Sequence, residues 1–358
     1  MTEEANGQDD ALLLTRDRGL GHIVLNRPKA INALTHDMAV RMNRVLGEWA
    51  DDPAVSAVLI TGAGERGLCA GGDIRAIYFD AKEGGTETLD FWRDEYHLNA
   101  RIADYPKPVV AVLHGLVMGG GIGVSAHAGQ RIVTEGSKLG MPEVGIGLVP
   151  DVGGSWLLAR SPGELGTHVA LSTTQFGPAD AIEMGFADWY LPAEALSGLA
   201  EALAAVPLGP DAAEAVRLVI ESRAEQPPAS TLAEQREWID TCYQGDSVED
   251  IVARLAASGE PDAERAAKEI GRKSPSCLKV ALAALRRARA LSLHECLNQE
   301  LRVSTHCFQA PDLAEGIRAQ VIDKDRDPKW SPSVLEQVTE EHVEHYFAAL
   351  GERELGLA

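Results

Sequence analysis

Cysteine is scarce in this sequence. The 358 residues include five cysteines, and none of them forms a C-x-x-C pair. An odd number of scattered cysteines fits neither a disulfide framework nor a zinc site. We therefore expect a reducing compartment and no bound metal ion.

Positive charge is also in short supply. The chain has 33 Lys and Arg against 54 Asp and Glu, which gives a formal net charge of −21. Nucleic-acid-binding proteins gain free energy when Lys and Arg displace counterions from phosphates, so this balance argues against such a partner. A small anionic ligand remains compatible with it, because a few cations and backbone N–H groups can hold one.

Segments that direct a chain to a membrane are lacking as well. The first ten residues, MTEEANGQDD, are acidic, whereas signal and transit peptides are basic. Residues 108–130 carry no charge, but their six glycines and two histidines are typical of a buried strand, a glycine loop and a helix. We predict a cytoplasmic protein with no membrane partner.

Short apolar runs alternate with helical patterns in the first two hundred residues. Residues 12–15 and 22–25 flank a turn-like segment and predict a hairpin. After Thr35, apolar side chains recur at helical spacing, which predicts a helix that Thr35 caps. This alternation predicts an α/β fold. Further strands are expected at 57–60, 109–113 and 131–134, and a polar helix at 87–104.

From Pro178 onward the sequence is mostly helical, and residues 192–206 are rich in Ala and Leu. Several prolines between residues 205 and 230 mark the best boundary. We divide the chain into an acidic tail (1–10), an α/β core (11–204) and a helical C-terminal region (205–358). Helices in the last region are expected at 212–223, 248–257, 276–290 and 293–305.

Two glycine loops follow predicted strands. In CAGGDI (69–74), paired glycines let the backbone approach a ligand, although this loop taken alone favours an ordinary strand-to-helix turn with Asp73 as its N-cap. In MGGGIG (118–123), three consecutive glycines indicate that something needs exposed backbone. One free N–H group from each loop could form an oxyanion hole. A rival pattern, G-x-G-x-x-A at 121–126 with Glu143 about 20 residues on, is a weak dinucleotide-binding signal.

A third loop, MPEVGIGLVPDVGG (141–154), holds two carboxylates. Glu143 and Asp151 are the only charged residues between positions 140 and 158. A carboxylate among apolar neighbours is partly desolvated, which raises its pKa and makes it a better base near neutral pH. Solvated loop or cap residues are an equally good interpretation. The sequence contains no G-x-S-x-G elbow, H-E-x-x-H motif or P-loop.

These loops and one earlier segment together resemble a known family. The four motifs are similar in order and sequence to the enoyl-CoA hydratase/isomerase, or crotonase, superfamily. The MPE–PDVGG pair and the C-terminal stretches resemble its 3-hydroxyisobutyryl-CoA hydrolase branch. The resemblance implies a crotonase-type spiral of ββα units with a helical C-terminal region, and a trimer-based homo-oligomer. The motifs are NRPKAINAL (26–34), GLCAGGDIR (67–75), HGLVMGGGIG (114–123) and MPEVGIGLVPDVGG (141–154); the C-terminal stretches are 274–282, 298–307 and 315–332.

The resemblance also implies catalytic residues. Gly72 and Gly120 would supply the two N–H groups of the oxyanion hole. Glu143 matches the catalytic glutamate of the family, and Asp151 matches the second acidic residue of the hydrolase branch. All but Gly72 would also contact the substrate.

Further substrate-binding positions follow from the same resemblance. Glu95, in WRDEYHLN, matches a residue that lines the acyl pocket. Arg75, and with it Lys29, would meet the phosphates of CoA, although both also fit as surface charges. CoA would be part of the substrate, so no separate cofactor is expected.

One departure from the hydratase pattern decides the predicted reaction. Hydratases carry a second catalytic glutamate three residues beyond the middle glycine of the triple-glycine loop, where this chain has Gly123. Thioester hydrolysis does not require this second carboxylate, because the leaving thiol has a pKa near ~8.5 and its thiolate therefore leaves with little acid assistance. We predict hydrolysis of a short β-hydroxyacyl-CoA, 3-hydroxyisobutyryl-CoA above all, to 3-hydroxyisobutyrate and CoA in valine catabolism. The alternatives are an enoyl-CoA hydratase/isomerase of the same fold, a nicotinamide-dependent oxidoreductase and a non-catalytic acyl-CoA-binding protein.

Overall fold

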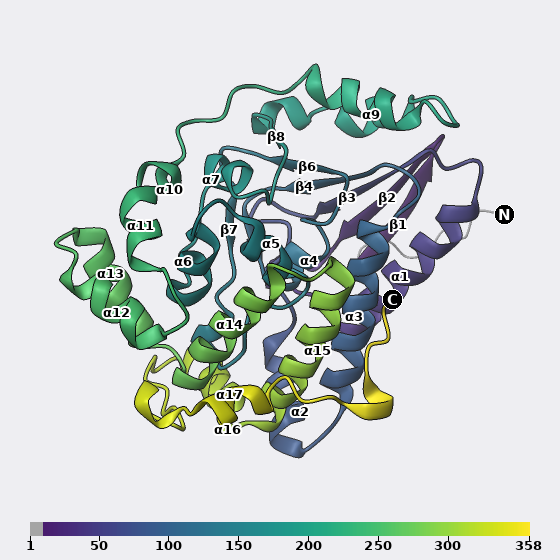
Figure 1. Cartoon of the computed structure of the whole chain (residues 1–358). Helices are drawn as coiled ribbons and strands as arrows, with labels where there is room; N and C mark the ends of the chain where they lie inside the picture. Colours follow the sequence, from purple (N-terminus) through teal and green to yellow (C-terminus); the bar gives the residue numbers. More distant parts are fainter. Residues whose placement is uncertain (1–9) are drawn as a thin grey trace.

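The computed structural model describes residues 10–358 (Figure 1). The predicted acidic tail, residues 1–10, lies outside the described residues except for Asp10. The carboxylate of Asp10 pairs with Arg41 of the first helix at 2.7 Å.

Six strands form the main sheet, in the order β1-β2-β3-β4-β6-β8. β1 and β2 are antiparallel, and each later neighbour is parallel. A second, parallel ladder joins β5 and β7. The strands are β1 (Leu12–Asp17), β2 (Leu20–Leu25), β3 (Ala57–Gly62), β4 (Val109–Leu113), β5 (Leu116–Met118), β6 (Gln130–Val133), β7 (Lys138–Gly140) and β8 (Trp189–Tyr190).

The apolar strands are covered on both faces. Every residue of β4 is buried. Because side chains alternate along a strand, Val110 and Val112 pack into one core with helices α8 (Leu199–Ala204) and α9 (Ala212–Glu221), whereas Val109 and Leu113 pack into the larger core on the other face. This double burial explains the continuous apolar run in the sequence. Figure 1 shows α9 lying across the sheet on the side opposite to α3 (Glu87–Ala103) and α15 (Leu293–Gln309).

Helices make up most of the remaining chain. Those before residue 205 are α1 (His36–Asp51), α2 (Ile74–Glu83), α3 (Glu87–Ala103), α4 (Gly120–Gly123), α5 (Gly154–Arg160), α6 (Leu165–Ser172), α7 (Pro178–Glu183) and α8 (Leu199–Ala204). Those after it are α9 (Ala212–Glu221), α10 (Thr231–Glu234), α11 (Arg236–Cys242), α12 (Val248–Ala257), α13 (Pro261–Ile270), α14 (Pro275–Ala288), α15 (Leu293–Gln309), α16 (Pro311–Ile317) and α17 (Glu340–His345). Short 3₁₀ turns are Pro28–Ala30, Glu143–Gly145, Ala193–Leu196, Leu335–Gln337 and Gly351–Arg353, and Arg318–Ile322 is a π-turn.

The hairpin, the three further strands and the first helix agree with the sequence prediction. The β1–β2 register runs from Leu12 opposite Leu25 to Asp17 opposite Leu20. Thr35 caps α1, because its hydroxyl accepts a hydrogen bond from the Met38 amide at 3.3 Å. Helix α12 begins and ends where the sequence places it.

Three local expectations hold only in part. The Ala/Leu-rich segment 192–206 is not one helix, because Gly198 adopts a φ of 70° and separates a 3₁₀ turn from α8. The helix after the triple glycine is short, since α4 spans four residues. Asp73 stands at the N-cap of α2 but makes no side-chain cap there; its carboxylate pairs with Arg27 at 2.9 Å.

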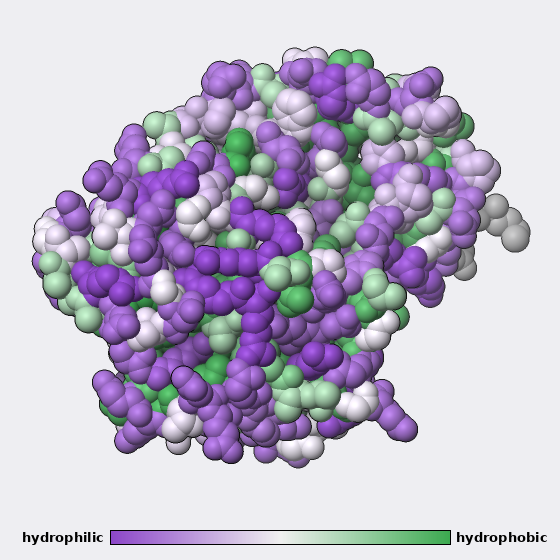
Figure 2. All heavy atoms as spheres, in the orientation of Figure 1, coloured by the Kyte–Doolittle hydropathy of each residue, from purple (hydrophilic) through white to green (hydrophobic). Residues whose placement is uncertain are grey.

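The C-terminal helices share one hydrophobic core with the α/β part. This core reaches from Leu12 of β1 to Leu355 near the end of the chain. Helices α14 and α15 pack against α5 and α3, and the last segment returns toward α1 and α3 (Figure 1). The surface seen in Figure 2 is mainly hydrophilic, with apolar side chains in small, separate groups. Among residues 10–358, no helix has the length and apolarity needed to cross a membrane.

Candidate active site

The two predicted glycine loops lie side by side. Cys69 pairs with Val117 in a parallel bridge, and the Met118 amide donates to the Cys69 carbonyl at 3.0 Å. Glycine is required at Gly121, where a Cβ would lie 2.5 Å from the Cys69 carbonyl oxygen. Gly71, with a φ of 104°, occupies backbone space that other residues rarely adopt. The close approach therefore depends on the missing side chains.

The NRPKAINAL segment (26–34) holds the first glycine loop in place through hydrogen bonds. The side chain of Asn32, fully buried, donates to the carbonyls of Ala63 and Gly67 at 3.0 Å each. The Leu34 amide donates to the Gly71 carbonyl at 2.8 Å, and the Leu34 carbonyl accepts from Asp73. This first motif is therefore a scaffold for the loop that carries Gly72.

Gly72 and Gly120 present the two candidate oxyanion donors. Within residues 10–358, neither amide donates a hydrogen bond to another protein group. The two glycines are close, because a Cβ built on Gly120 would lie 3.4 Å from the Gly72 nitrogen. The Gly120 N–H also opens α4, where no intrahelical acceptor exists. Two free, neighbouring N–H groups are the arrangement that a developing oxyanion needs.

Glu143 lies beside these donors. It opens the 3₁₀ turn after β7 and is 4% exposed. A Cβ on Gly119 would lie 3.0 Å from its Oε1, while its Oε2 has no hydrogen-bond partner. Burial first, and then the charge of Asp151, raise the pKa of Glu143 well above its ordinary value. A buried carboxylate with one free oxygen can serve as a base or as a nucleophile.

Asp151 is buried, and its carboxylate accepts a hydrogen bond from a side chain of α3. The Tyr96 hydroxyl donates to Asp151 Oδ2 at 2.7 Å and is itself 2.9 Å from the Ser304 hydroxyl of α15. Burial raises the pKa of Asp151 to about 6, although the hydrogen bond from Tyr96 opposes this shift. Of the two neighbouring carboxylates, Asp151 is therefore the one that ionises more easily.

Glu95 reaches the same place from α3. Its side chain is 2% exposed, and its Oε1 has no hydrogen-bond partner. A Cβ on Gly120 would overlap with that oxygen, so the Glu95 carboxyl lies against the glycine loop. Burial, followed by the charge of Asp151, raises the pKa of Glu95 well above its ordinary value. The structure thus brings Gly72, Gly120, Glu143, Asp151 and Glu95 together.

Two predicted cations are not in this group. Arg75 and Lys29 are exposed, on α2 and on the 3₁₀ turn Pro28–Ala30 respectively. Arg75 is three residues from Gly72 in the sequence, but it is exposed and lies outside the buried cluster. Its contact with a CoA phosphate stays a prediction.

Sequence reasoning missed the residues behind the carboxylates. Glu300 of α15 accepts hydrogen bonds from the amides of Gly153 and Ser155 at 2.6 and 3.0 Å. It therefore fixes the loop that follows Asp151, and burial raises its pKa to about 8. Tyr96 directly follows Glu95 on α3, and both side chains are buried. Its position next to Glu95 was the signal that could have pointed to Tyr96.

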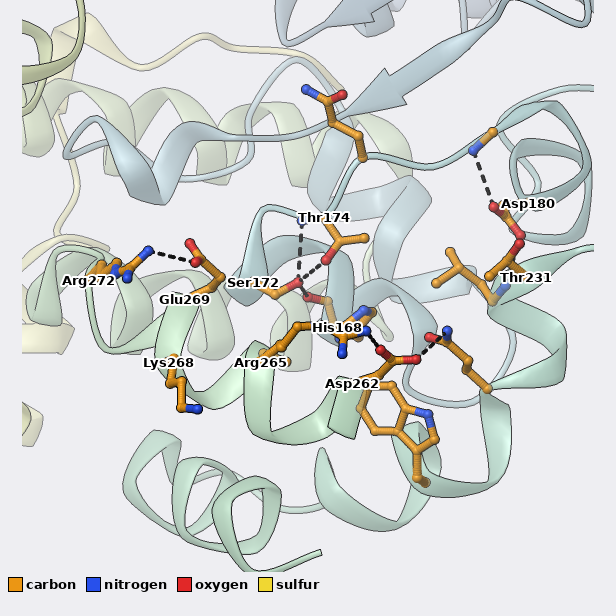
Figure 3. A pocket seen from close by; sticks show the side chains of 16 residues that line it. His168, Ser172, Thr174, Asp180, Thr231, Asp262, Arg265, Lys268, Glu269 and Arg272 are labelled. Atoms are coloured by element: carbon orange, nitrogen blue, oxygen red, sulfur yellow. Dashed lines mark hydrogen bonds and ion pairs between the residues drawn. The ribbon is translucent and has the colours of Figure 1, made fainter. Parts of the chain in front are cut away.

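A separate pocket lies among α6, α10 and α13 (Figure 3). Its volume is about 650 Å³, and the five candidate residues are not among those that line it. Its charges pair with one another: Asp262 contacts Arg265 and accepts from Gln235 at 3.0 Å, and Glu269 pairs with Arg272. This internal pairing gives no reason to place chemistry there.

Comparison with known families shows to which family the chain belongs. Residues 20–347 match the family model described as enoyl-CoA hydratase/isomerase. The chain belongs to the enoyl-CoA hydratase/isomerase family. This result confirms the predicted crotonase resemblance and the α/β fold class.

Relatives of this family member carry more than one name. The mitochondrial 3-hydroxyisobutyryl-CoA hydrolase of Xenopus tropicalis is 38% identical over 98% of this chain and 92% of its own length. The Rattus norvegicus protein of the same name is 40% identical over 96% of this chain and 90% of its own. A solved structure described as a carnitinyl-CoA dehydratase from Mycobacterium thermoresistibile is 50% identical, with a TM-score of 0.91, and covers 98% of this chain and 99% of its own. Another, described as an enoyl-CoA hydratase from Rhodobacter sphaeroides, is 39% identical, with a TM-score of 0.89, over 97% of this chain and 99% of its own.

The structure explains why position 123 is glycine in this family member. A Cβ there would lie 2.7 Å from Asn99 Nδ2 and 2.7 Å from Val152 Cβ. Any side chain would therefore displace Asn99 or Val152, and a glutamate has no room. The second carboxylate of the hydratase pattern is absent at this position, and its space is occupied.

Proposed function

We propose that this protein hydrolyses the thioester bond of a short β-hydroxyacyl-CoA, with 3-hydroxyisobutyryl-CoA as its substrate. The observation that carries the proposal is one buried glutamate, Glu143, beside two free N–H groups, with Gly123 where a hydratase has its second glutamate. The names of the curated relatives, at 38–40% identity over nearly the whole chain, support the same reaction.

Hydrolysis of the thioester requires only a few groups of this site. The thioester oxygen accepts hydrogen bonds from the amides of Gly72 and Gly120, which stabilise the charge that develops on it by about 3–4 kcal/mol per donor. Glu143 takes a proton from water as the oxygen of that water adds to the carbonyl carbon, or attacks that carbon itself. On either route the tetrahedral intermediate expels the CoA thiolate. When Glu143 acts as the base, the thiolate takes the proton that Glu143 removed from water. When Glu143 attacks the carbon, a mixed anhydride with Glu143 is left, water hydrolyses it to free the acid and restore the carboxylate, and the proton released in that step goes to the thiolate. Asp151 orients the water or holds the β-hydroxyl group, and Glu95 shapes that end of the pocket.

The second candidate is an enoyl-CoA hydratase or isomerase that uses Glu143 alone. It is favoured by the descriptions of the two solved structures, a dehydratase and a hydratase. The crowded space at Gly123 argues against it, because addition of water across a double bond in this family employs two carboxylates.

The deciding experiment compares two substrates. We expect free thiol, detected with a thiol-reactive dye, from 3-hydroxyisobutyryl-CoA, and no loss of the double bond of crotonyl-CoA. Loss of that double bond without free thiol would contradict the proposal and identify a hydratase.

The pH dependence of this hydrolysis should report the raised pKa of Glu143. Because the base must be ionised, kcat/KM should fall as pH falls, along an acidic limb well above the ordinary glutamate pKa. The charge of Asp151 contributes to that shift, so Asp151→Asn should move the limb of the residual activity down by about one pH unit. Rate profiles of thiol release between pH 5 and 9 would show this, and a limb that moves upward would contradict it.

The wider setting follows from the proposed reaction. Hydrolysis of 3-hydroxyisobutyryl-CoA would serve valine catabolism, with water as co-reactant and no separate cofactor. We retain the cytoplasm as the proposed location, although the curated relatives are named as mitochondrial. The trimer-based homo-oligomer also stays a prediction.

A further inference from the structure

Unpartnered polar atoms are concentrated in one place. Among residues 10–358, the buried side-chain polar atoms that lack a hydrogen-bond partner belong to Glu95, Asn99 and Glu143. Asn99 is completely buried, and neither its Oδ1 nor its Nδ2 has a partner. A buried amide without partners costs free energy, so such a group in a folded protein calls for a partner such as a water molecule, an ion or a ligand. Asn99 has no role in the chemistry described above.

The amide of Asn99 lies in line with the Glu95 carboxyl. The two residues are one helical turn apart on α3, so they share a face. That face packs against α4, where Gly120 and Gly123 are also one turn apart. Glu95 lies against Gly120, and Asn99 lies against Gly123. The side chains of Glu95 and Asn99 thus occupy the space that side chains at positions 120 and 123 of α4 would need.

The same face is next to the second carboxylate. The Cβ position of Gly123 that touches Asn99 also touches Val152, the residue after Asp151. Asn99 is therefore enclosed by α4, by the loop that holds Asp151 and by Glu95, which are three parts of the candidate site.

We propose that Asn99 is a substrate-binding residue that, together with Glu95, hydrogen-bonds the β-hydroxyl group of the acyl chain and selects hydroxylated thioesters over unsubstituted ones. This inference rests on the proposed function, since it concerns the substrate of the same site. A hydroxyl group both donates and accepts, and Asn99 Nδ2 can donate to it while Glu95 Oε1 or Asn99 Oδ1 accepts from it. An acyl chain without the hydroxyl group leaves these buried atoms unpaired, which penalises its binding.

The test uses two unreactive CoA thioethers in which a methylene group separates the sulfur atom from the carbonyl. One carries a β-hydroxyl group and the other carries hydrogen in its place. Calorimetry on the full chain should show that the hydroxylated probe binds about 10- to 100-fold more tightly. In Asn99→Leu, which keeps the shape of the side chain and removes both polar atoms, the preference should fall to within about 3-fold.

A matched control separates recognition from damage to the fold. Gln299→Met removes another buried amide, on α15, whose Nε2 lies 3.4 Å from the Ala284 carbonyl, and it should keep the full preference. Asn99→Ala, which creates space without a clash, repeats the test if Asn99→Leu does not fold. Equal loss of affinity for both probes, or an unchanged preference in the Asn99 variants, would overturn the inference and leave Asn99 as a structural residue.

Hydrolysis of 3-hydroxyisobutyryl-CoA and isobutyryl-CoA distinguishes this inference from the function on which it rests. Thiol release from both esters at equal kcat/KM would preserve the thioesterase and overturn the inference. No thiol release, together with a probe preference that Asn99→Leu abolishes, would overturn the proposed function and support the role of Asn99.

Discussion

Replacing Glu143 with glutamine should lower the kcat of thiol release from 3-hydroxyisobutyryl-CoA by about 10³-fold. The amide can neither take a proton from water nor attack the carbonyl carbon. The substitution conserves the shape of the side chain, and Glu143 Oε2 has no hydrogen bond to lose. Removal of a buried carboxylate with a raised pKa also lowers the cost of burial, so the variant should fold.

Single-turnover thiol release and calorimetry with the unreactive hydroxylated thioether should therefore separate chemistry from binding. The Kd for the thioether should change by less than about 5-fold, because the interaction that is lost acts mainly in the transition state. Glu249→Gln gives a matched control, since Glu249 pairs with Lys279 away from the site. Turnover in Glu143→Gln at the rate of the unchanged protein would contradict the mechanism.

The glycine loops could be predicted from the sequence because their signal is local. Gly71 and Gly121 have to be glycine for reasons of backbone angle and close approach, and such positions appear in a sequence as unusual glycine runs. The uncharged stretch around Glu143 and Asp151 fitted buried and solvated carboxylates equally well, and the structure shows that both are buried.

The supporting residues could not be predicted because their partners are distant in the sequence. Tyr96 and Asp151 are 55 residues apart, and Tyr96 and Ser304 are 208 residues apart. The sequence predicted a polar helix at 87–104 without showing which of its side chains are buried, and in the structure Glu95, Tyr96 and Asn99 of this helix, α3, are all buried. A polar helix enters a core when its polar groups line a site, and composition alone cannot distinguish that from exposure.

Helix α15 makes the C-terminal region part of the site. Glu300 holds the amides of Gly153 and Ser155, and Ser304 contacts the tyrosine that donates to Asp151. Two backbone donors and the Ser155 hydroxyl group reduce the cost of burying this carboxyl group without cancelling it, since burial still raises the pKa of Glu300 to about 8. The helical region after residue 205 thus stabilises the conformation of the catalytic loop, in addition to covering the core.

Replacing Gly120 with alanine should lower thiol release by about 10²- to 10³-fold, the loss that follows removal of one oxyanion donor. The new Cβ would overlap with Glu95 Oε1 and lie 3.1 Å from Leu34 Cδ1. Either the Glu95 carboxyl or α4 has to move to relieve this contact, and a shift of α4 takes the Gly120 N–H group away from the position where it meets the thioester oxygen. Glu143 keeps its carboxylate in this variant, so the loss reports on the triple-glycine loop and the Glu95 carboxyl beside it, and not on the catalytic base.

The control is Gly129→Ala, at a position where a Cβ meets only ordinary contact, 3.9 Å from the Val109 carbonyl. Its activity should be unchanged, and both variants should show the same far-ultraviolet circular dichroism as the unchanged protein. Full activity in Gly120→Ala would show that the oxyanion lies elsewhere. A loss in both kcat and kcat/KM, as expected for an interaction made in the transition state, would place the developing charge against the triple-glycine loop.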